Sequence, residues 1–409
     1  MDQDFKPLLR PMVLLRTQAQ GKKYIVVQDP ERVGNTVMLP GDLEGVLMIF
    51  DGKNSLRDIQ VTLTRQMGGQ IVPLDDIKRL VEEMDANLLL DSPRFRDAID
   101  QASFFWNVFN IRKPFHAGHA YEKDAKKLKS MLDGFYESDD GPGKPRGEGP
   151  FVKGLLAPHI DIKNGGPTFA WAYREIAQSP PADLYIVLGT AHNPSPGPFS
   201  LTRKDYMTPF GIMPTDTDFV DRLTKRFSAP WLLHDAAHRM EHSIEFQVVF
   251  LQHALGPEPR ARILPVLAGF GRHVSEAPPP WEDADVEGFL GALSEEVARS
   301  GKRVTFIVGG DLAHIGPRYG DAEPVIPSDL TACSEKDHAM LEPAAAGDAK
   351  GFYKYIADEG DRRNICGLPP LYAMLTLLDG IKGKMLRYDH WFDQPTRSAV
   401  TFASMVWHS

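Results

Sequence analysis

Histidine, aspartate and cysteine side chains stand directly after apolar runs in the second half of this chain. His159 and His192 each end such a run, and a third run leads through two glycines into Asp311 and His314. Cys366 is one of only two cysteines in 409 residues, and it precedes a Gly-Leu-Pro-Pro sequence typical of a helix start. Imidazole and thiolate ligands together suit Fe(II), Zn(II) or copper, and not Mg²⁺ or Ca²⁺. These residue types therefore indicate a metal centre.

Two alternatives compete with a reactive metal centre. A structural zinc site usually has closely paired ligands such as Cys-x-x-Cys, and the sequence contains no such pair. Three protein ligands with open positions would instead give a reactive site. A nucleophilic Cys–His pair stays the alternative interpretation of Cys366, and a lone cysteine or histidine is most often a packing residue.

The sequence EHSIE at 241–245 reads as the start of a helix and supplies two more polar side chains, His242 and Glu245. Glu245 follows His242 by about one helical turn. It is expected either to support that histidine or to be solvated.

An alternation of apolar runs and helical patterns from residue 152 onward predicts an α/β domain with a sheet core flanked by helices. The run ADLYIVLGTAH is almost wholly apolar, which is typical of a strand buried on both faces. Because ligand sites in such sheets form at the carboxyl ends of the strands, the polar residues that follow the runs are expected to meet there. The last two runs, KMLRYDHW and SAVTFASMVWH, are predicted to be edge strands.

Residues 1–95 predict a separate small α+β domain. The segment MVLLRTQAQGKKYIVVQDP reads as a β-ribbon around a Gly-Lys-Lys turn at 21–23. An apolar helix, a helix capped by Ser55 and a third helix are expected to follow, and residues 88–90 would return to the sheet as a short strand. The third helix has one apolar stripe, formed by Ile77, Leu80, Val81 and Met84.

This order of elements resembles a small winged helix and, in detail, the PqqD-like modules that bind peptides beside radical enzymes. Residues 1–91 contain 11 Lys+Arg and 14 Asp+Glu, a net charge of −3, and the whole chain has a net charge of −9. Phosphate-binding surfaces need an excess of positive charge. We therefore expect a peptide and no nucleic acid as the partner of this module.

Residues 96–150 are expected to connect the two domains and in part to belong to the second. They contain a predicted helix with Leu128, Met131 and Leu132 on one face, followed at 137–150 by a stretch of Gly, Pro and charged residues. Such a composition predicts a mobile loop. Residues 151–409 then make up the metal-binding domain.

The start of the chain lacks the basic and apolar regions of a secretory signal, and no apolar run reaches the ~18 residues of a membrane span. With only two cysteines, a reduced, cytoplasmic protein without membrane contact is expected.

Six sequence blocks, in order between about residues 110 and 409, resemble the Memo family. They are LLAPHIDIKNGG, IVLGTAHNPSPGPFSLTRKDYMTPFG, EHSIEFQVVFLQ, ILPVLAG, FIVGGDLAHIGPRYG and NICGLPPLYAML. HAGHAY at 116–121 resembles the family's amino-terminal His-Ala-Gly stretch. With its added amino-terminal module, the chain is similar to the bacterial form of the AmmeMemoRadiSam system (protein B), which implies a radical-SAM protein and an AMMECR-like protein as partners.

The resemblance implies a fold shared with the class III extradiol dioxygenases (LigB-like), which are non-haem iron enzymes. It implies His159, His192 and Cys366 as metal ligands, with Fe(II) first and Cu or Zn as alternatives. In the dioxygenases a carboxylate takes the place of the cysteine, so ring cleavage does not carry over. Asp161 and Asn193 also stand where Memo proteins usually have Gly and His, and the substrate therefore does not carry over either.

The acid–base positions of the implied fold fall on His242, Asp311 and His314. His314 would transfer a proton near neutral pH, and His242 would hydrogen-bond O₂ or substrate. Asp311 would orient an imidazole or stay charged near the metal. These roles predict redox chemistry at a mononuclear metal. The alternatives are a binding or adaptor protein with a vestigial metal site, and a zinc hydrolase.

Overall fold

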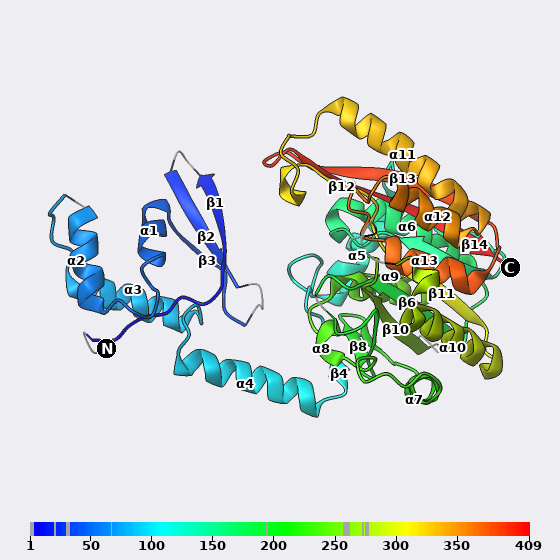
Figure 1. The fold of residues 1–409 in the computed structure, drawn as a ribbon, viewed down its shortest axis with the longest axis horizontal. Coiled ribbons are helices and arrows are strands. Elements are labelled where there is room, and N and C mark those ends of the chain that lie inside the picture. Colours follow the sequence, from blue (N-terminus) through cyan, green and yellow to red (C-terminus); the bar gives the residue numbers. More distant parts are fainter. Residues whose placement is uncertain are drawn as a thin grey trace. The chain divides into compact units, whose positions relative to one another are not determined.

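The structure is a computed structural model that describes residues 4–19, 22–29, 33–66, 68–193, 195–256, 262–271, 274 and 278–409. The chain divides into two compact units, Met1–Phe109 and Asn110–Ser409 (Figure 1). The predicted boundary near residue 95 falls inside helix α4 (Pro93–Val108), which the sequence analysis did not anticipate. Ser92 caps this helix by accepting a hydrogen bond from the Phe95 amide at 3.2 Å, and Pro93 occupies its first turn.

The first unit contains an antiparallel three-stranded sheet in the order β1-β2-β3. The predicted ribbon is confirmed as β1 (Val13–Ala19) and β2 (Lys22–Gln28). Lys22 and Lys23 of the predicted turn belong to β2, and Gly21 lies outside the described residues. The third strand, β3 (Val37–Pro40), was not predicted, because it is only four residues long and leads directly into a helical turn.

The apolar helix expected in the next segment is divided into two short helices, η1 (Gly41–Leu43) and α1 (Glu44–Leu47). The next two helices, α2 (Leu56–Gln66) and α3 (Leu74–Ala86), match the prediction, and the Ser55 hydroxyl accepts the Asp58 amide at 3.2 Å. The predicted return strand at 88–90 is wrong: Leu90 forms a single bridge with Leu9 and does not join the sheet.

The second unit is built on an eight-stranded sheet in the order β12-β14-β5-β11-β6-β10-β7, with β13 paired to β14 (Figure 1). Its strands are β5 (Val152–Ala157), β6 (Leu184–Thr190), β7 (Phe199–Leu201), β10 (Arg262–Ala268), β11 (Val304–Gly309), β12 (His314–Ile315), β13 (Gly383–Asp393) and β14 (Ser398–His408). The four strands β5, β11, β6 and β10 are parallel neighbours. This confirms the α/β fold class.

The prediction that both C-terminal strands lie at an edge is wrong for β14. It pairs antiparallel with β5 on one side and with β13 on the other, so all but its last residue are buried. An apolar run at the end of a chain does not reveal from its composition whether one neighbour or two will flank it.

Helices cover both faces of the sheet. Along β6, Leu184, Ile186 and Leu188 pack into one hydrophobic cluster and Tyr185 and Val187 into a second, as the alternation of side chains along a strand requires. The first cluster includes residues of α7 (Thr217–Arg226), α10 (Ala284–Ser300), α11 (Pro327–Ala346), α12 (Ala349–Asp358) and α13 (Leu368–Leu378). The second includes residues of α5 (Ala125–Glu137), α6 (Ile162–Gln178) and α9 (His242–Leu255).

Smaller elements complete the second unit. A three-stranded sheet has the order β4-β8-β9, and the remaining helices are short. The strands of this small sheet are β4 (Ile111–Arg112), β8 (Asp205–Thr208) and β9 (Gly211–Met213). The short helices are α8 (Asp235–His238), η2 (Pro280–Glu282) and η3 (Pro317–Tyr319).

The segment 137–150 has no regular secondary structure beyond the end of α5, as its composition predicts. Its backbone carbonyls nevertheless accept hydrogen bonds from α6: Trp171 donates to Asp140 at 3.0 Å and Gln178 to Arg146 at 2.8 Å. In the described ranges of both units, every helix is too short or too polar to cross a bilayer.

Candidate metal centre

Three parallel strands bring predicted site residues to one edge of the sheet. His159 follows β5, His192 follows β6 and Asp311 follows β11, and these strands are neighbours in the sheet. Because parallel strands end at the same edge, the three side chains converge although up to 152 residues separate them in the sequence.

Helix α9 begins at the same edge because two glycines leave room for it. A Cβ atom on Gly189 would lie 2.5 Å from the Ser243 hydroxyl, and one on Gly309 would lie 2.2 Å from the Ser243 carbonyl. A side chain at either position would displace the start of α9 or its side chains. This close approach brings His242, the first residue of α9, beside the strand ends.

Three imidazoles consequently meet at this edge. The ring centroids of His159 and His192 lie 4.8 Å apart, those of His159 and His242 5.1 Å, and those of His192 and His242 4.6 Å, with the last pair stacked. One nitrogen from each ring lies within 4.8 Å of the other two, a spacing that can hold one metal ion.

The Nδ1 atoms of these rings face fixed acceptors. His159 Nδ1 lies 2.9 Å from the Gly309 carbonyl, and His192 Nδ1 lies 2.9 Å from Glu241 Oε1. His242 Nδ1 lies 3.3 Å from the same carboxylate oxygen. When Nδ1–H donates, Nε2 keeps its lone pair, and this is how outer-shell groups orient histidines toward a metal.

Glu241 is a site residue that the sequence analysis missed. It precedes α9 as its N-cap, is 1% exposed, and also accepts hydrogen bonds from the backbone amides of His192 and Ser243. Burial alone would raise the pKa of Glu241, but its hydrogen bonds and the neighbouring His192 and His242 together hold that pKa well below its usual range. The available signal was a carboxylate immediately before a histidine at a predicted helix start.

The three histidines form one donor group, and His159 also belongs to a second group with Asp311 and Cys366. Cys366 Sγ lies 3.1 Å from His159 Nε2 and 3.6 Å from the backbone oxygen of Asp311. Asp311 Oδ1 accepts the backbone amides of His159 and Ile160 at 2.8 and 3.1 Å, while Oδ2 lies 3.7 Å from His159 Nε2. Asp311 therefore orients the segment that carries His159, and the carboxylate, imidazole and thiol offer ligand atoms within 4.8 Å of one another.

Burial keeps His159 and His242 neutral near pH 7. It lowers the pKa of His159 to about 3, and it also lowers the pKa of His242, with the neighbouring histidines adding to the effect. Burial raises the pKa of Asp311 to about 6 and raises that of the Cys366 thiol, which Asp311 raises further. Neutral imidazole is the form that binds metals, and a bound cation would deprotonate the thiol.

The predicted ligands His159, His192 and Cys366 come from both groups and do not form one such group by themselves. His159 belongs to both, His192 to the all-histidine group and Cys366 to the group with Asp311. His242, predicted as an acid–base residue, lies as close to His159 and His192 as a ligand would. A donor set of imidazoles, one thiol and one carboxylate fits a mononuclear transition metal.

Among the described residues, His314 belongs to neither donor group. Its Nδ1 is 3.2 Å from the Leu312 carbonyl and its ring packs edge-on against Tyr319. Burial lowers the pKa of His314, while the nearby Asp311 acts in the opposite direction.

Glu245 does not act on His242 as expected, and the alternative that it is solvated is also wrong. It is fully buried and pairs with Arg112, while its Oε1 and Oε2 accept the amides of His116 and Phe115. The Tyr121 hydroxyl donates to it at 2.5 Å. Glu245 thus fixes the 112–121 segment, whose His116 packs its ring 5.6 Å from that of His242.

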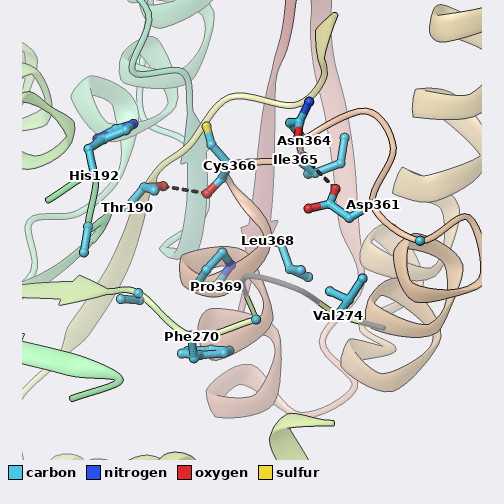
Figure 2. A pocket seen from close by; sticks show the side chains of 15 residues that line it. Thr190, His192, Phe270, Val274, Asp361, Asn364, Ile365, Cys366, Leu368 and Pro369 are labelled. Atoms are coloured by element: carbon cyan, nitrogen blue, oxygen red, sulfur yellow. Dashed lines mark hydrogen bonds between the residues drawn. The ribbon is translucent and has the colours of Figure 1, made fainter. Parts of the chain in front are cut away.

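A cavity of about 520 Å³ opens beside the site. In Figure 2, His192 and Cys366 lie at its upper side and Phe270 and Val274 at its lower side. Thr190 donates to the backbone oxygen of Cys366 at 2.8 Å and so joins the end of β6 to the cysteine loop. The cavity gives a small molecule access to both residues.

The fold and the site together define an α/β protein with a histidine-rich pocket at the carboxyl edge of its sheet. Residues 112–406 match the family described as Memo-like protein. This match covers well over half of the chain, and the chain therefore belongs to the Memo-like family.

Relatives of the chain are found in bacteria and archaea. A MEMO1 family protein of Aquifex aeolicus is 26% identical over 395 residues, which cover 96% of this chain and 97% of the relative. A MEMO1 family protein of Thermus thermophilus is 27% identical, with 86% of this chain and 98% of the relative covered. A MEMO1 family protein of Methanosarcina barkeri is 27% identical and covers only 68% of this chain, with 92% of its own length matched.

Proposed function

We propose that this Memo-like protein binds a single transition-metal ion, Fe(II) in the first place, through His159, His192 and Cys366. The observation that carries the proposal is the orientation of the imidazoles. Their Nδ1 atoms face the Gly309 carbonyl and Glu241, and Cys366 Sγ lies 3.1 Å from His159 Nε2. Copper or zinc would fit the same donors.

A bound iron ion would supply redox chemistry and open positions for O₂ or substrate. The chain's own groups do the remaining work. Glu241 fixes the orientation of His192 and His242, and Asp311 fixes the segment that carries His159. His242, neutral near pH 7, would hydrogen-bond O₂ or substrate, and His314 would take up or release a proton.

The wider context of the protein belongs to the same proposal. We assign it a fold like that of the class III extradiol dioxygenases and a cytoplasmic location. A radical-SAM protein and an AMMECR-like protein are the proposed partners, and the amino-terminal unit is a PqqD-like module for a peptide. The near-complete coverage of the Aquifex relative supports the amino-terminal unit as part of a shared architecture.

Metal analysis and O₂ consumption test the proposal. Protein produced with iron and purified without oxygen is expected to contain close to one iron ion per chain and to consume O₂ in an iron-dependent manner. Retention of zinc alone, with no activity restored by iron, would favour the zinc hydrolase. Bound metal without any turnover would favour the adaptor protein.

A further inference from the structure

A fully buried carboxylate outside the candidate metal centre joins two of the segments that build it. Asp337 lies in α11 and is 0% exposed. Its Oδ1 pairs with the Arg363 guanidinium, and its Oδ2 accepts hydrogen bonds from the hydroxyls of Tyr388 at 2.8 Å and Thr401 at 2.6 Å. Three elements distant in sequence therefore meet at one side chain.

Through Thr401, Asp337 reaches the segment between Asp311 and His314. The Thr401 hydroxyl that donates to Asp337 accepts the Ala313 amide at 2.9 Å. The backbone of Thr401 also bonds the Ala313 carbonyl at 2.9 Å and the Leu312 amide at 2.8 Å. The position of Thr401 thus sets the path of the chain between two site residues.

Through Arg363, Asp337 reaches the loop that ends in Cys366. The Arg363 carbonyl accepts the His314 amide at 2.7 Å, and the adjacent Asn364 side chain donates to the His314 carbonyl at 3.2 Å. Asn364 has a backbone φ of 51°, which residues other than glycine rarely adopt without support from their surroundings. Arg363 directly precedes this residue, and Asp337 holds its side chain.

Neutralisation of Arg363 does not by itself explain Asp337. The guanidinium also pairs with Glu359 at 2.6 Å, so its charge keeps a partner without Asp337. Burying a carboxylate costs more than burying an apolar side chain of the same size. The geometry that Asp337 imposes on its neighbours is therefore the better account of its presence.

We propose that Asp337 is a positioning residue, which sets the distance between the His314 segment and the Cys366 loop through Thr401 and Arg363. It touches none of the predicted ligands directly. Its loss would leave the donor residues in the sequence but would allow the distance between the His314 segment and the Cys366 thiol to increase. Groups that orient metal ligands without binding the metal themselves typically contribute ~10–100-fold in metal affinity.

The test compares Asp337→Asn with Glu296→Gln by Co(II) titration, following the thiolate-to-cobalt charge-transfer absorption. Glu296 is a matched control: it is 2% exposed and pairs with Arg222 and Arg226, but its helix carries none of the predicted site residues. Both variants are expected to unfold at lower temperature. Only Asp337→Asn is expected to weaken Co(II) binding, by ~10–100-fold, and to shift the absorption band.

Equal Co(II) affinity and equal spectra in the two variants would overturn the inference. Thr401→Val, which keeps the charge pair and cuts one link, is expected to lie between the wild type and Asp337→Asn, and it replaces that variant if Asp337→Asn does not fold. Failure of the wild type to bind Co(II) would instead reject the proposed function. The inference is then decided in metal-free protein, where Asp337→Asn, and not Glu296→Gln, should change the rate at which a thiol reagent modifies Cys366.

Discussion

At the scale of single residues, the proposed ligation requires His159 and His192 to present Nε2 to the metal. Glu241 Oε1 lies 2.9 Å from His192 Nδ1 and 3.3 Å from His242 Nδ1, so one carboxylate holds two rings. Glu241→Gln presents an amide that can both donate and accept, and the ring orientation is then no longer unique. We expect metal affinity to fall ~10–100-fold, measured by competition with a chelator. An unchanged affinity would show that Glu241 does not orient a ligand.

The two cysteines offer an internal control for ligation. Cys366 lies 3.1 Å from His159 Nε2, whereas Cys333 is buried within α11 with Asp337 as its polar neighbour at 3.9 Å. Cys366→Ser is expected to lose most of the bound metal because a hydroxyl seldom ionises as a thiol does. Cys333→Ser is expected to keep it. Metal analysis of both purified variants decides, and equal retention would refute the ligand assignment.

His314 and His192 are expected to respond differently to truncation. His192 belongs to a donor group, while His314 belongs to neither and contacts the Leu312 carbonyl and the Tyr319 ring. His314→Ala should keep the metal and lower turnover by ~10²–10⁴-fold, as loss of an acid–base group does. His192→Ala should lose the metal. Loss of metal from His314→Ala would make it a fourth ligand.

Sequence reasoning could find the residues at strand ends but not the residues that orient them. His159, His192 and Asp311 follow apolar runs that are visible in the sequence, and the parallel sheet brings them together. Glu241 escaped notice because an N-cap carboxylate has an ordinary structural role. The contact of Asp311 with the backbone of His159 was also unpredictable, because it depends on the register between β5 and β11.

At the scale of elements, the approach of α9 to the sheet edge sets the position of His242. A Cβ at position 309 would meet the Ser243 carbonyl at 2.2 Å and the Gln247 side chain at 2.7 Å. Gly309→Ala should therefore push α9 outward, lower stability by about 1–3 kcal/mol and weaken metal binding.

The matched control is Gly291→Ala in α10, where a Cβ has open space. It should raise stability by about 0.4–1 kcal/mol, because alanine restricts the unfolded chain. Thermal unfolding of both variants measures the difference. An equally stable Gly309→Ala protein would show that the helix can move without cost.

The elements differ in how far the sequence predicts them. The parallel strands were evident because burial on both faces makes a strand uniformly apolar. The same uniformity concealed the interior place of β14, since order within a sheet depends on partners distant in sequence. Helix α4 crosses the predicted domain boundary. The sequence did not reveal this helix, because exposed aromatic residues such as Phe104 obscure a simple apolar stripe.

At the scale of the whole molecule, the two units are expected to fold independently. The division between Phe109 and Asn110 leaves every predicted site residue, and also Glu241 and Asp337, in the second unit. A chain that begins at Asn110 should therefore remain folded and bind metal with the affinity of the full chain. Circular dichroism and metal titration check this. Aggregation of the shortened chain would mean that the first unit covers part of its core.

The atoms bound to the metal distinguish the proposed ligands from the all-histidine group. X-ray absorption at the iron edge, on protein loaded with Fe(II) without oxygen, reports the ligand atoms whatever the activity. We expect one sulfur ligand at about 2.3 Å together with imidazole nitrogens at a shorter distance. A wild-type spectrum that contains nitrogen and oxygen ligands only would contradict this expectation and would favour the group formed by His159, His192 and His242.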